Sequence, residues 1–188
     1  MIVDSNSINE QDLKCDICIV GSGPASMTLV SKYLNSNKKI IIIESGNFNY
    51  NKNIQELNNG IVEGFGNYPH NNYSLNAARI RKIGGTSNVW AGWSSPLTDF
   101  DFIKKDWINH SGWPFELSEL KKYYLEAQKI LELGEFKYDE SIFEYYPKKS
   151  KEQILTEYEN FFWQFSKPPV NFGDKYIKDI ENKKNIFL

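Results

Sequence analysis

A glycine-rich turn follows the first apolar run of the chain, in the stretch CDICIVGSGPAS at residues 15–26. Gly21 permits a sharp turn, and Gly23 lets the backbone approach a negatively charged group closely. Pro24 is suited to the first position of a helix, whose N–H groups and dipole favour an anion. Ser26 stands where a third glycine or an alanine is usual, and its small side chain is compatible with close helix–strand packing. The turn therefore predicts an anion site of the kind that binds a pyrophosphate.

Glu44 ends the second apolar run, at residues 39–44. It follows Gly21 at about the 20-residue spacing of the acid that binds ribose hydroxyls in dinucleotide-binding folds. A carboxylate at this position also repels a 2′-phosphate. The pattern favours a dinucleotide site over a generic α/β turn with an accidental acid, but it does not by itself separate NAD from FAD.

A second glycine segment, RIRKIGGTSNVWAGWSSP, occupies residues 79–96. Gly84 and Gly85 again permit close backbone approach, and three short polar residues follow them, TSN at 86–88. Such a loop suits a phosphate or the edge of a flavin ring. By spacing alone, an ordinary turn between aromatic core segments is an equal alternative.

Two strands and a helix must position these residues. The apolar runs at 15–20 and 39–44 predict buried strands, and the pattern from Pro24 to about Leu34 predicts a helix packed on them. Nearly continuous apolar runs are typical of parallel sheets covered on both faces. Cys15 and Cys18 are therefore interpreted as small buried strand residues, and neither a redox pair nor a metal site is predicted.

The remainder of the chain is more irregular. Residues 1–14 form a polar tail, and residues 46–78 form an Asn-rich excursion that is too long for an idle connection. The aromatic-rich segment 97–166 contains the best helical pattern, at about 118–133, with Ser118 as its expected N-cap. Further patterns predict a helix near 150–160, a strand at 161–166, a short helix at 173–184 and a final strand in NIFL.

The chain as a whole resembles the glucose-methanol-choline (GMC) family of FAD-dependent oxidoreductases. It is most similar to the sugar-oxidising branch, which includes pyranose 2-oxidase and the large subunits of fructose and gluconate dehydrogenases. The resemblance lies in VGSGPAS, IIIESG, the R-x-R-x-x-GGTSNVWAGWSSPL segment, DWINHSGWPF with its following helix, and SKPPVNFGDKY. It implies the N-terminal part of an FAD-binding Rossmann-like (βαβ) domain over residues 15–188, which is incomplete and carries an inserted irregular and helical segment.

The resemblance also implies which residues hold the cofactor. Glu44 would bind the adenosine ribose, and the other positions would lie along the pyrophosphate and the isoalloxazine: Gly21, Gly23, Pro24, Ala25, Ser26, Arg81, Gly84, Gly85, Thr86, Ser87 and Asn88. Several relatives attach the flavin covalently to a histidine where this chain has Val89, so FAD is expected to be held non-covalently. Trp90 and Trp93 are expected in the core or beside the flavin.

The family oxidises CH–OH groups by hydride transfer to flavin N5, with a histidine base from its C-terminal part. The two histidines of this chain, His70 and His110, do not match that position. The resemblance thus implies an alcohol or sugar substrate and an unknown electron acceptor, but no catalytic residue within the 188 residues. The chain alone is expected to be inactive and to bind FAD poorly. Another two-dinucleotide flavoprotein and a non-catalytic nucleotide-binding fragment remain alternatives.

Bulk composition limits the other partners. The 22 basic and 24 acidic residues are nearly balanced, which disfavours nucleic acid as a partner. The longest apolar run is too short to span a membrane. The polar N-terminus lacks the pattern of a secretory signal, so the expected location is cytoplasmic.

Overall fold

The computed structural model describes residues 1–9, 13–61, 75–144 and 160–188. These residues form two compact units, one made of Met1–Trp90 with Asn171–Leu188 and the other of Ala91–Val170. We refer to them as unit 1 and unit 2. The elements follow in this order: η1 (Ser5–Ser7), β1 (Ile17–Val20), α1 (Pro24–Tyr33), β2 (Ile40–Ile43), α2 (Lys52–Gln55), η2 (Glu56–Asn58), α3 (Leu75–Ala78), η3 (Gly85–Asn88), α4 (Asp99–Phe102), α5 (Leu117–Ile130), η4 (Glu140–Glu144), α6 (Phe172–Glu181) and β3 (Ile186–Phe187).

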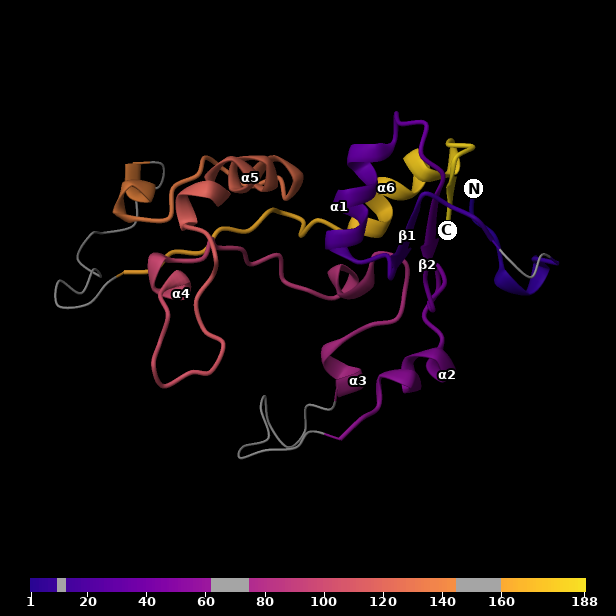
Figure 1. The fold of residues 1–188 in the computed structure, drawn as a ribbon, viewed down its shortest axis with the longest axis horizontal. Helices are drawn as coiled ribbons and strands as arrows, with labels where there is room; N and C mark the ends of the chain where they lie inside the picture. Colours follow the sequence, from indigo (N-terminus) through magenta and orange to yellow (C-terminus); the bar gives the residue numbers. More distant parts are fainter. Residues whose placement is uncertain (10–12, 62–74, 145–159) are drawn as a thin grey trace. The chain divides into compact units, whose positions relative to one another are not determined.

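Unit 1 is built on a parallel sheet in which β2 lies between β1 and β3. The register pairs Ile17 with Ile40 and Ile40 with Ile186. A parallel pair needs a crossover connection, and α1 supplies it between β1 and β2. Figure 1 shows α1 and α6 side by side next to β1 and β2. The expected α/β class is confirmed as a mixed α/β arrangement with a small parallel sheet.

One face of this sheet is the core of unit 1. Because side chains alternate along a strand, every second residue faces the helices. Ile40 and Ile186 are fully buried, and each such isoleucine contributes about 1.5–3 kcal/mol relative to an exposed one. The other buried apolar side chains of the strands and of the two helices are Ile19, Ile42, Met27, Val30, Phe172, Tyr176 and Ile180.

The opposite face of the sheet is open within the described part of the chain. Val20 is 81% exposed and Ile43 is 55% exposed. Cys18 lies on this face and is exposed, whereas Cys15 precedes β1 and is half-buried. The expectations of a sheet covered on both faces and of two buried cysteines are therefore wrong for the described residues, because α1 and α6 pack on the same face.

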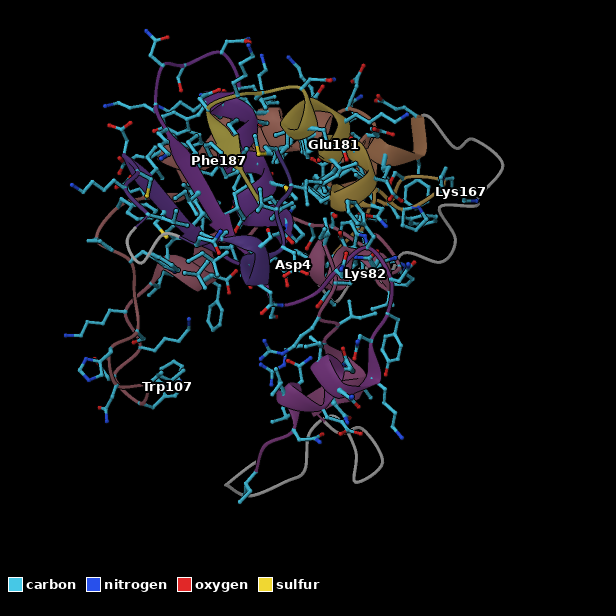
Figure 2. All side chains as sticks on the ribbon, turned by 90° about the vertical axis from the view of Figure 1, so that its right-hand side faces the viewer. Asp4, Lys82, Trp107, Lys167, Glu181 and Phe187 are labelled. Atoms are coloured by element: carbon cyan, nitrogen blue, oxygen red, sulfur yellow. The ribbon has the colours of Figure 1, made fainter. Side chains whose placement is uncertain are left out.

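The first residues of the chain pair with the last ones. The Val3 N–H donates to the Leu188 carbonyl at 2.8 Å, and the Leu188 N–H donates to the Met1 carbonyl at 2.9 Å. The Met1 ammonium group also donates to the Ile186 carbonyl at 2.6 Å, and partial burial lowers the pKa of this group. Figure 2 labels Phe187 on β3, the strand whose end receives these hydrogen bonds, and Glu181 at the end of α6. Residues 1–3 thus lie alongside β3.

Unit 2 contains α5, the longest helix among the described residues. The helix begins at Leu117, and the N-cap is Glu116, which forms a reciprocal capping box with Glu119. The expected cap at Ser118 is therefore two residues too late, because Ser118 is the second residue of the helix. At the other end Glu132 adopts φ of 55°, and the Leu133 N–H donates to the Gln128 carbonyl at 2.9 Å, which ends the helix in a Schellman-type turn.

Polar and aromatic contacts hold the rest of unit 2. The buried Gln128 accepts a hydrogen bond from the Tyr138 hydroxyl at 2.6 Å and donates to the Gly134 carbonyl at 2.9 Å. The strand expected at 161–166 is reduced to one antiparallel bridge between Gln164 and Ser94. The helix expected near 150–160 falls almost wholly outside the described residues. None of the helices in the described part of the chain is long and apolar enough to cross a membrane.

Candidate functional site

The predicted anion site lies where β1 and β2 end. The Gly21 N–H donates to the Ile43 carbonyl at 2.7 Å, so the turn after β1 is attached to the end of β2. Gly21 has φ of 89°, a conformation that a side chain would strain. Because the carboxyl ends of parallel strands meet at one edge of a sheet, Glu44 comes next to this turn.

The first turn of α1 adjoins the same edge. Gly23 is the N-cap of α1, no side chain caps the helix, and Pro24 occupies the first helical position. The early N–H groups of a helix have no partner within it, so they can receive an acceptor from outside. A Cβ atom built on Gly21 or on Gly23 would meet nothing within 4 Å. The backbone of this turn therefore faces open space.

The second glycine segment lies against the first. The Gly84 N–H donates to the Ser22 hydroxyl at 3.1 Å across 62 positions of sequence. A Cβ atom on Gly85 would lie 3.1 Å from the Cα atom of Gly23, so a larger residue would have to displace the turn. The structure thus brings together both glycine motifs and Glu44, as the sequence pattern required for a single site.

The polar residues after Gly85 turn towards the protein. The Ser87 hydroxyl donates to the Gly84 carbonyl at 2.6 Å and accepts from the Phe172 N–H at 3.1 Å. The Asn88 amide donates to the Gly85 carbonyl at 2.7 Å. The Thr86 hydroxyl oxygen lies 3.5 Å from the backbone nitrogen of Ile80. The side chains of Ser87 and Asn88 consequently hold the loop itself, while Gly84 and Gly85 border the first turn.

Arg81 is engaged by the segment that follows β2. Its guanidinium donates to the Asn58 side-chain oxygen at 2.8 Å and to the Ser45 hydroxyl at 2.9 Å. Its backbone N–H donates to the buried Gln55 side chain at 3.0 Å. A Cβ atom on Gly46 would lie 2.4 Å from the Arg81 carbonyl carbon, so only glycine at position 46 allows the two backbone segments to approach this closely. Arg81 therefore fastens the start of the excursion to the second glycine segment.

A network of serine and carboxylate contacts joins these parts, and the sequence pattern did not reveal it. Glu44 Oε2 accepts from the Ser22 N–H at 2.8 Å and from the Ser22 hydroxyl at 2.6 Å. Glu44 Oε1 accepts from the Gly46 N–H at 2.8 Å and from the Ser45 hydroxyl at 3.3 Å. Ser22 and Ser45 stand beside the motif residues in GSG and ESG, and that adjacency is the only signal the sequence carried.

The remaining expected positions belong to the end of the second glycine segment, to unit 2 or to the residues that the structure does not describe. Val89 follows η3 and is 59% exposed. Trp90 packs on Phe172 with ring centroids 6.5 Å apart. Trp93 belongs to unit 2 and is 60% exposed, so it does not lie in a core, and its alternative place beside a flavin stays a prediction. His110 is exposed in a loop of unit 2 with φ of 60°. His70 lies outside the described residues.

Comparison with known proteins adds no assignment. No model of a known protein family matches the chain, and no curated protein is significantly similar to it. The function must therefore be argued from the site.

Proposed function

We propose that unit 1 binds the ADP half of FAD, and that the chain supplies the FAD-binding part of a GMC-type oxidoreductase acting on CH–OH groups. The observation that carries the proposal is the open space at the Cβ positions of Gly21 and Gly23, beside Glu44 at the carboxyl edge of β1 and β2. This edge is where doubly wound α/β folds bind dinucleotides. The strand order β1–β2–β3 is that of one half of such a Rossmann-like fold.

The chemistry of the edge suits the two polar parts of an ADP group. Backbone N–H groups and the α1 dipole favour the pyrophosphate, and a carboxylate accepts hydrogen bonds from ribose hydroxyls. The position of Gly84 and Gly85 against the same turn supports a ligand that extends past the pyrophosphate. FAD, when bound, would accept a hydride at its flavin ring, and with Val89 in place of the tethering histidine the chain would hold it without a covalent bond.

Titration of the purified chain tests the proposal. Isothermal calorimetry with FAD, ADP and FMN separates recognition of the ADP half from recognition of the flavin half. We expect the chain alone to bind FAD and ADP weakly but measurably, with FAD bound at least as tightly as ADP. FMN should give no heat, because it has neither the pyrophosphate nor the adenosine ribose. Absence of binding by both FAD and ADP, or equal binding of FMN, would contradict the proposal.

A further inference from the structure

We propose that Ser22 is a positioning residue that fixes the Glu44 carboxylate so that the site selects an adenosine ribose with a free 2′-hydroxyl. This inference rests on the proposed nucleotide-binding function. Sequence motifs assign the residue between the two glycines no side-chain role, because only its backbone belongs to the pattern. The structure gives the side chain two partners, Glu44 and Gly84, on two other segments of the chain.

Ser22 is fully buried between these segments. Its hydroxyl donates to Glu44 Oε2 at 2.6 Å and accepts from the Gly84 N–H at 3.1 Å. Its own N–H donates to the same carboxylate oxygen at 2.8 Å. A hydroxyl has one donor and two acceptor positions, so this side chain can link a carboxylate and an N–H at the same time. One serine therefore joins the turn after β1, the end of β2 and the second glycine segment.

The two oxygens of Glu44 consequently have different roles. Oε2 is held by a buried residue and cannot turn away without leaving Ser22 unpaired. Oε1 is held by the Gly46 N–H at 2.8 Å and, at the longer distance of 3.3 Å, by the hydroxyl of exposed Ser45. The Ser45 oxygen can keep its 2.9 Å hydrogen bond from the Arg81 guanidinium while its proton turns away from Oε1, so a ribose hydroxyl can donate to Oε1 in its place. Oε1 is then the atom that contacts the ribose.

A fixed carboxylate also discriminates between a ribose with a free 2′-hydroxyl and one with a 2′-phosphate. A 2′-phosphate placed against Glu44 would face a like charge, and that repulsion is relieved if the carboxylate can rotate away. Ser22 prevents the rotation, because it holds Oε2 through two hydrogen bonds. Loss of the Ser22 hydroxyl should therefore weaken the preference for an unphosphorylated ribose as well as the affinity itself.

The experiment compares two ligands that differ by one group, ADP-ribose and 2′-phospho-ADP-ribose. Their dissociation constants are measured by calorimetry for the wild-type chain, Ser22→Ala, Glu44→Gln and Ser31→Ala. Ser31→Ala is the matched control, because the Ser31 hydroxyl makes a 2.7 Å bond to the Thr28 carbonyl within α1. A variant that is partly unfolded weakens both ligands by the same factor, so the ratio of the two constants reports positioning and not stability.

We expect the wild-type chain to prefer ADP-ribose by more than about tenfold and Ser22→Ala to reduce that preference about tenfold, as for loss of a hydrogen bond to a charged group. Glu44→Gln should reduce it similarly, and Ser31→Ala should retain it. An unchanged ratio in Ser22→Ala would overturn this inference alone. Failure of the wild-type chain to bind either ligand would overturn the proposed function and this inference with it.

If Ser22→Ala does not fold, Ser22→Cys keeps a side chain of similar shape with a much weaker donor. The ratio of its dissociation constants for the two ligands should fall between the ratios of the wild-type chain and Glu44→Gln. A ratio equal to that of the wild-type chain would overturn the inference in this variant too.

Discussion

A Cβ atom on Gly84 would lie 2.5 Å from the backbone nitrogen of Gly173, so the second glycine segment reaches the first turn of α6 only because both residues lack side chains. Gly173 is constrained in the same way, since its Cβ would lie 2.7 Å from the Ile83 carbonyl oxygen. Gly23 differs from both, because nothing lies within 4 Å of its Cβ position. These glycines therefore separate into those whose missing side chain permits close packing and those whose Cβ position is open space.

Gly84→Ala should destabilise unit 1. Its φ of 88° is unfavourable for alanine, and the added carbon would collide with backbone that cannot easily move. We expect a loss of at least about 2 kcal/mol in the free energy of unfolding, measured by urea denaturation. A variant as stable as the wild-type chain would show that η3 and α6 do not approach as described.

Gly23→Ala should leave the stability nearly unchanged and remove ADP binding. The backbone at Gly23 has φ of −72°, which alanine adopts readily, and its Cβ would enter open space. We expect an unfolding free energy within about 0.5–1 kcal/mol of the wild-type value. Binding of ADP in calorimetry should be abolished, because the methyl group would occupy the position that we propose for the pyrophosphate. Undiminished ADP binding by this variant would place the ligand elsewhere.

Cys18 should react with a thiol reagent in the native protein. It lies on the open face of the sheet, next to Val20, which is 81% exposed. Brief treatment with N-ethylmaleimide followed by peptide mass spectrometry should show modification of Cys18 ahead of half-buried Cys15. Modification of Cys18 only after addition of denaturant would mean that this face is covered in solution.

Asp16 should make the start of β1 sensitive to acid. The pKa of its carboxyl is lowered, first by the hydrogen bond from the Lys39 N–H at 2.8 Å and then by the Lys38 side chain at 3.3 Å. Because the folded-state pKa lies below the unfolded value of about 3.9, the ionised carboxylate stabilises the folded protein at any pH above that value. This contribution is lost as the pH falls through the folded-state pKa. Asp16→Ala should therefore have a lower Tm than the wild-type chain at neutral pH, and this difference in Tm should become smaller in acid. A difference in Tm that does not change with pH would show that the charge of Asp16 is not its cause.

Supplied with FAD, the 188-residue chain should not oxidise sugars or alcohols. The resembling family uses a histidine base, and His110 is exposed in a loop of unit 2 while His70 lies outside the described residues. The assay follows the reduction of an artificial electron-acceptor dye by absorbance, with a panel of sugars and polyols as substrates. The rate of dye reduction should equal the rate with free FAD alone. Turnover above that background would contradict the expectation that the catalytic base is not in this chain.

Local pattern was sufficient for the parts of the site that depend on neighbours in sequence. The helix expected from Pro24 to about Leu34 is α1 at Pro24–Tyr33, and the two strands that flank it lie within their expected ranges. These elements follow from apolar periodicity, a proline at the first helical position and a glycine that must take a positive φ. The same patterns placed Gly21 and Glu44 at one edge of the sheet, because parallel strands end together.

Pattern was insufficient where a residue's role depends on distant segments. An apolar run such as IIII looks the same whether one or both faces of its strand are covered, so the exposure of Ile43 was not predictable from the sequence. The side chains of Ser87 and Asn88 look equally suited to a ligand or to their own loop, and only the structure shows the hydrogen bonds that they make with that loop and with the start of α6.

The sequence by itself determined that a glycine turn, a helix start and an acid would share one edge of a parallel sheet, since each depends on residues close along the chain. Only the tertiary structure decided that Ser22 connects that edge to Gly84, through a hydrogen bond that spans 62 positions. A hydrogen bond of this kind depends on distances and directions of about an ångström, which packing sets and which residue spacing does not encode.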